Sequence, residues 1–101
     1  MFTLVKGTNH VKMKWYMENL KNKIKSQDLN IPQDYDVAKV VNSIMNNETI
    51  GVITIDEKNN LIDGHKRIEA INDFINNEYS KLSLEDKEKF DNYELTILLI
   101  Q

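Results

Sequence analysis

The chain has 101 residues, which is enough for one domain with a single hydrophobic core and too few for two. Hydrophobic residues make up 41% of it and charged residues 29%, a balance typical of a globular domain and not of a disordered one. The chain contains no cysteine. This excludes a disulfide scaffold, a thiolate zinc site and a cysteine nucleophile.

Neither a membrane span nor a secretion signal is expected. No apolar run approaches the roughly 18 residues of a transmembrane helix, and the longest one covers only residues 95–100. Residues 1–6 have no small-residue cleavage site. We therefore expect a cytoplasmic protein with no membrane partner.

The net charge of −3 hides a strong asymmetry along the chain. Residues 1–30 carry six lysines and two acidic residues, whereas residues 31–101 carry seven basic and fourteen acidic residues. A basic segment on an acidic body can contact a polyanion or can simply be a solvated face. Trp15 and Tyr16, an aromatic pair at the end of the strand expected at 11–16, could stack on a base beside Lys12 and Lys14, or could belong to the core or its rim. The candidate nucleic-acid contacts are Lys12, Lys14, Trp15, Lys21 and Lys25.

The pattern of apolar residues predicts an α+β fold with a mixed sheet. In chain order, strands are expected at about 2–6 and 11–16, on either side of a turn at residues 7–9, and a helix at about 17–25. A helix at 36–47 then precedes strands at 50–55 and 60–63. A helix at 65–77, a helix at 83–90 that Ser83 caps, and a strand at 93–100 complete the chain.

Residues 63–67 form the clearest chemical constellation, at a junction between a strand and a helix. Gly64 permits a tight turn, and the N-terminus of the following helix attracts anions. Arg67 can grip a phosphate with two hydrogen bonds. His65 could act as an acid or base, while Asp63 could hold a metal ion, orient His65 or cap the helix. The alternative is an ordinary glycine turn with an Asp cap and solvated basic side chains, Lys66 among them.

Other catalytic arrangements are not suggested by the sequence. His10 and His65 are the only histidines, and their spacing gives no zinc-binding pair. The four serines, Ser26, Ser43, Ser80 and Ser83, fall in helical or capping contexts, which does not indicate a Ser-His-Asp triad.

The segment 61–71, which reads LIDGHKRIEAI, resembles the second conserved box of the ParB/sulfiredoxin-like superfamily. In that family a strand runs into a G-x-x-R turn at the start of a helix. Residues 42–55 are similar to the family's preceding "SI…G…PI.V" stretch. The order of motifs is most similar to the N-terminal domain of GmrSD-type, modification-dependent restriction enzymes, whose motif reads IDGQQR. The resemblance covers about residues 17–101, so that 1–101 is one domain and 1–16 is a divergent extension.

The resemblance implies a nucleotide- or nucleic-acid-binding role. It assigns the phosphate-contacting turn to Gly64, His65, Lys66 and Arg67, with catalytic roles for His65 and Asp63 and a nucleoside triphosphate with Mg²⁺ as the cofactor. Two departures bear on catalysis. The family's first-box arginine is missing after Ile31 and Pro32, and His65-Lys66 replaces Gln-Gln. Sulfiredoxin activity is excluded because that family's cysteine would lie at His65.

Three functions follow as hypotheses, and whether the chain is an enzyme stays open. The first is a stand-alone ParB-like domain that binds a nucleotide or nucleic-acid phosphate, as a phage or mobile-element regulator of a DNA-related process. The second is an active nucleoside-triphosphate hydrolase or DNA-nicking domain. The third is a protein-interaction module, an inhibitor or decoy that docks on a larger host or phage protein without a ligand.

Overall fold

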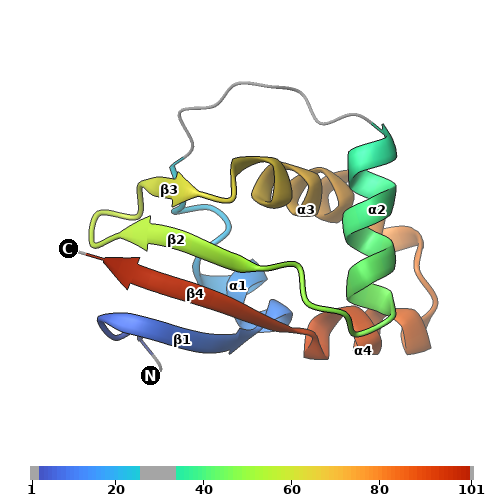
Figure 1. Cartoon of the computed structure of the whole chain (residues 1–101). Helices are drawn as coiled ribbons and strands as arrows, with labels where there is room; N and C mark the ends of the chain where they lie inside the picture. The colour runs from blue at the N-terminus through green and yellow to red at the C-terminus, as the bar shows by residue number, and fades with distance from the viewer. Residues whose placement is uncertain (1–2, 26–33, 101) are drawn as a thin grey trace.

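The computed structural model describes residues 3–25 and 34–100. It consists of a mixed four-stranded sheet with helices packed on it (Figure 1). The predicted α+β class is confirmed. The elements in chain order are β1 (Gly7–Lys12), α1 (Met13–Asn19), α2 (Asp34–Met45), β2 (Val52–Asp56), β3 (Leu61–Asp63), α3 (His65–Asn77), the 3₁₀ helix η1 (Tyr79–Lys81), α4 (Leu84–Asn92) and β4 (Glu94–Ile100).

The sheet has the strand order β1-β4-β2-β3, so that the last strand of the chain lies in the middle (Figure 1). β4 pairs antiparallel with β1 and parallel with β2. β2 and β3 form an antiparallel hairpin with an irregularity in its register next to Thr54. The parallel β2–β4 pair needs a crossover between its strands, and β3, α3, η1 and α4 provide it.

The core lies between the helices and one face of the sheet. Side chains alternate between the two faces of a strand, and one face carries the fully buried Ile53, Ile55, Leu95 and Ile97. These pack in one cluster with apolar residues of all four helices, which include Met13, Tyr16, Ile44, Ile68, Ile71, Phe74 and Phe90. On the opposite face Val52 remains 42% exposed.

Most of the predicted elements are present with shifts of one to three residues at their ends. The helix predicted at 65–77 has those bounds in α3. The Ser83 cap is also present, because the Ser83 hydroxyl accepts a hydrogen bond of 3.2 Å from the backbone N–H of Asp86. α4 then continues two residues beyond the predicted end, to Asn92.

The prediction for the first 25 residues was wrong in its register. Residues 3–6 form no strand, and the expected turn at 7–9 is the start of β1. Asn9 is the cause of this error, because it is a polar residue that is buried on the core face, where the pattern predicts an apolar one. Its amide is satisfied locally: the side-chain oxygen accepts from the backbone N–H of Val5 at 2.8 Å, and the nitrogen donates to the Val5 carbonyl at 2.7 Å.

The strand expected at 11–16 and the helix expected at 17–25 are replaced by α1 at Met13–Asn19. Met13, Tyr16 and Leu20 are all buried, and their spacing is helical, so burial favours a helix that begins four residues earlier than predicted. The chain then turns, and Lys25 forms an isolated bridge with Asn60 at the edge of the sheet. Within the described residues no helix is long and apolar enough to cross a bilayer.

Candidate functional site

The turn between β3 and α3 requires a glycine. Gly64 is the N-cap of α3 and has a φ of 99°, in the left-handed region that side chains disfavour. A Cβ at this position would lie 2.7 Å from the Cδ1 of Ile53 in the core. Gly64 has no side chain that could cap the helix, and the first turn of α3 contains no acidic residue. The positive end of the α3 dipole is therefore not compensated by a carboxylate in that turn.

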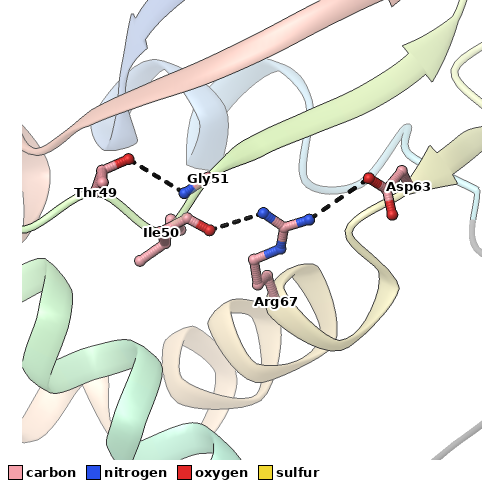
Figure 2. Close-up of polar contacts among 5 residues, drawn as sticks. All are labelled: Thr49, Ile50, Gly51, Asp63 and Arg67. Atoms are coloured by element: carbon pink, nitrogen blue, oxygen red, sulfur yellow. Dashed lines mark hydrogen bonds and ion pairs between the residues drawn. The ribbon is translucent and has the colours of Figure 1, made fainter.

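Arg67 ties this helix to the segment that leads into β2. Figure 2 shows its guanidinium between the backbone carbonyl of Ile50 and the carboxylate of Asp63. Nη1 donates to the Ile50 oxygen at 2.8 Å, and Nη2 lies 3.8 Å from Oδ2 of Asp63. The Arg67 side chain is 27% exposed. A guanidinium has five N–H donors, so these two contacts leave donors for a ligand.

Arg67 also lines a hollow between α2, α3 and the segment before β2, which we call the α2–α3 pocket. Its volume is about 350 Å³. Among the residues that the structure describes, the polar and charged groups around it are three cations, one carboxylate and two hydroxyls, supplied by Lys39, Lys66, Arg67, Asp36, Ser43 and Thr49. The Thr49 hydroxyl accepts the backbone N–H of Gly51 at 3.2 Å, which leaves its own proton to donate (Figure 2). This group of donors suits an anion.

The residues predicted at 63–67 fall into two groups. Lys66 and Arg67 line the α2–α3 pocket, whereas Asp63 and His65 are not among its lining residues. The Asp63 side chain is 75% exposed and faces Arg67. The described residues hold no group of three or more histidine and acidic side chains that could bind a metal ion. The catalytic roles of His65 and Asp63 and the metal role of Asp63 stay predictions.

Four polar residues of this pocket, Asp36, Lys39, Ser43 and Thr49, were not predicted from the sequence as site residues. Lys39 and Ser43 are four residues apart on α2, so they share one face of that helix. That spacing was the available signal, but nothing in the chain shows that this face meets the start of α3. Thr49 lies in the segment after α2, where no periodicity exists to place it. Ile31 and Pro32, after which the family's first-box arginine would be expected, lie outside the described residues.

The five candidate nucleic-acid contacts do not lie at one place. Lys12, Lys14 and Trp15 meet around a second hollow of about 310 Å³, between β1 and α1, which we call the β1–α1 pocket. Lys21 and Lys25 line neither this pocket nor the α2–α3 pocket. Trp15 lies on α1 and not at the end of a strand as predicted.

Comparisons of this chain with protein-family models, with curated proteins and with solved structures each return no match.

Proposed function

We propose that this protein binds a phosphate group of a nucleotide or a nucleic acid in the α2–α3 pocket. The observation that carries the proposal is the convergence of three cations, Lys39, Lys66 and Arg67, from two helices on one hollow at the N-terminus of α3. A phosphate there would receive charge-assisted hydrogen bonds and would lie near the positive end of a helix dipole.

The remaining polar groups favour a nucleotide over a bare phosphate. Ser43 and Thr49 can donate to phosphate oxygens, whereas the Asp36 carboxylate would repel them. A carboxylate beside an anion site is instead suited to accept hydrogen bonds from ribose hydroxyls or base amino groups. A nucleoside triphosphate carries a Mg²⁺ ion, which the carboxylate of Asp36 or of the exposed Asp63 could coordinate.

The proposal agrees with the resemblance to ParB/sulfiredoxin-like domains, in which the G-x-x-R turn contacts phosphate. Here Gly64 shapes the turn and Arg67 supplies the guanidinium, while Lys39 contributes a cation that the motif alone does not include. A binding role, as a regulator or accessory of a DNA-related process, requires no further catalytic group. Hydrolysis would require an acid or base at the phosphate. The candidate from the sequence is His65, which is adjacent to Lys66 but does not itself line the pocket.

The test is thermal unfolding of the full chain with each of ATP, CTP, GTP and UTP, with and without Mg²⁺, followed by calorimetric titration. A ligand at about 100 times its Kd stabilises the folded state by roughly 2.7 kcal/mol, a clear rise in Tm for a chain of this size. Lys66→Ala is the informative variant because its exposed side chain makes no hydrogen bond or ion pair among the described residues. We expect it to weaken binding by about tenfold or more.

Lys81→Ala is the matched control, since Lys81 is an exposed lysine on η1 whose ion pair in the described part of the chain is with Glu78. It should leave nucleotide binding unchanged. The absence of any Tm shift or heat of binding with all four nucleotides and with a short DNA duplex would refute the proposal. Measuring phosphate release in the same samples distinguishes the hydrolase hypothesis, which requires release that His65→Ala abolishes.

A further inference from the structure

Trp15 separates two hollows on the surface of the molecule. It lines the β1–α1 pocket and also a neighbouring hollow of about 290 Å³ that includes Lys23, which we call the Lys23 pocket. Asn19 lines both pockets as well. Because Trp15 is the only tryptophan of the chain, this arrangement places the largest aromatic side chain at a boundary that a ligand could reach from two sides.

The Trp15 side chain is positioned before any ligand arrives. It is half-buried, packs against the hydrophobic core and makes further contacts of its own. The Asn19 amide donates to the Trp15 backbone carbonyl at 3.1 Å, which fixes this turn of α1. An aromatic ring that is held in place loses little conformational entropy when a planar ligand packs on it.

Lysines lie in both hollows beside this ring. Lys12 and Lys14 line the β1–α1 pocket, and Lys23 lines the other. None of these three lysines forms an ion pair within the part of the chain that the structure describes. One carboxylate lies in each hollow, Glu18 and Glu57 respectively, so that the excess of positive charge is on the side of β1.

We propose that Trp15 is a stacking platform for single-stranded nucleic acid, with Lys12 and Lys14 contacting phosphate on one side of the ring and Lys23 contacting phosphate on the other. An aromatic ring among lysines is the arrangement by which single strands are bound without sequence preference. The placement of lysines on both sides favours a strand over a mononucleotide, because one nucleotide has phosphate on one side only. This site shares no lining residue with the α2–α3 pocket, so it does not depend on the function proposed there.

The first experiment titrates the full chain with a thymidine oligonucleotide and follows tryptophan fluorescence. With a single tryptophan the signal reports only on Trp15. We expect stacking to quench it, and thymidine monophosphate to bind at least about tenfold more weakly. Contacts with three phosphates predict that log K falls with log salt with a slope of about −2. Lys12→Ala and Lys23→Ala should each reduce that slope, and Lys81→Ala should not.

A labelled oligonucleotide and fluorescence anisotropy then test the ring itself. Trp15→Phe keeps an aromatic face, whereas Trp15→Leu keeps apolar bulk for the core without one. We expect near-normal binding for the first and a loss of about five- to 150-fold for the second, with thermal unfolding showing that both variants fold. Equal binding by the two, equal affinity for the monophosphate, or no quenching would overturn the proposal. Lys66→Ala should quench like the wild type, which separates this result from failure of the α2–α3 pocket.

Discussion

Arg67 stabilises the fold as well as lining the candidate pocket. Its guanidinium lies over Gly51 and next to Gly64, and its hydrogen bond to the Ile50 carbonyl joins two segments that are 17 residues apart. Removing the side chain would therefore weaken the fold and the pocket together. For this reason an alanine at Lys66 tests binding more cleanly than one at Arg67.

At Gly51 the structure predicts a steric conflict that depends on Arg67. Gly51 has a φ of +89°, and a Cβ there would overlap Nη1 of Arg67, which could move away only by giving up its hydrogen bond to the Ile50 carbonyl. We expect Gly51→Ala to lower the free energy of unfolding by about 1–3 kcal/mol, measured by urea denaturation. In an Arg67→Ala background the steric part disappears and only the backbone strain remains, so the same substitution should cost less. Additive effects of the two substitutions would show that the two residues are not in contact.

The turn after β2 predicts a dependence of stability on pH. The Asp56 carboxylate accepts the backbone N–H groups of Lys58 and Asn60, each at 2.9 Å, and the Asn60 side-chain amide at 3.0 Å. The bond from the Asn60 side chain contributes most to lowering the pKa of Asp56. A lowered pKa stabilises the folded state above the unfolded value of about 3.9, and this contribution is lost as the pH falls through the folded pKa.

We therefore expect Asp56→Ala to have a lower Tm than the wild type at pH 7. The difference should narrow as the pH falls below about 4, where the wild-type carboxylate becomes protonated as well. Glu57→Ala, at the exposed neighbouring position, serves as the control and should change the Tm little at either pH. A gap between Asp56→Ala and wild type that stays constant from pH 7 to pH 2 would contradict this account.

Among the elements, α1 and α3 are joined by one buried polar contact. The Tyr16 hydroxyl, on a fully buried side chain, donates to Oδ1 of Asn72 at 2.6 Å. Burial raises the pKa of Tyr16, so its hydroxyl stays protonated and remains a donor across the physiological range. Asn72 is half-buried, whereas the Tyr16 residue has no solvent-exposed surface.

This asymmetry predicts the order of two substitutions. Asn72→Ala leaves a buried hydroxyl without a partner and should lower the free energy of unfolding by about 1–3 kcal/mol. Tyr16→Phe removes the hydroxyl itself and should cost less, about 0.5–1.5 kcal/mol. The double variant should be less destabilised than the sum of the two, measured by urea unfolding of all four proteins. A larger loss for Tyr16→Phe than for Asn72→Ala would reverse the argument.

Elements with an uninterrupted apolar period could be predicted from the sequence, and those with a polar residue in the core could not. Apolar residues at helical spacing placed α3, and Ser83 marked the start of α4. Asn9 interrupts the alternation of apolar and polar residues in β1. Asparagine is typical of turns, and the sequence does not show that this side chain is buried with its hydrogen bonds made. The candidate site shows the same limit. Residues 64–67 are adjacent in sequence and could be found, but Lys39 and Thr49 join them only through tertiary packing.

At the scale of the whole molecule, the basic and acidic parts of the chain are folded onto one sheet. Of the six lysines before position 30, Lys12, Lys14 and Lys23 line the two hollows beside Trp15. The cations of the α2–α3 pocket come from the acidic remainder of the chain, where Lys39, Lys66 and Arg67 are three of its seven basic residues. The net charge therefore says little about either site, since each depends on a few cations gathered by the fold.

The central position of β4 has a consequence for synthesis on the ribosome. β1 and β2 do not pair with each other in the sheet, since both pair with β4, which is made after the other three strands of the sheet. Asn9 and Ile97, which share a hydrogen bond, are 88 residues apart. The nascent chain can form helices and the β2–β3 hairpin as it emerges, but the sheet closes only once residues 94–100 have left the exit tunnel. Folding is thus completed after translation of the domain, with the slower closure that pairing over long sequence distances imposes.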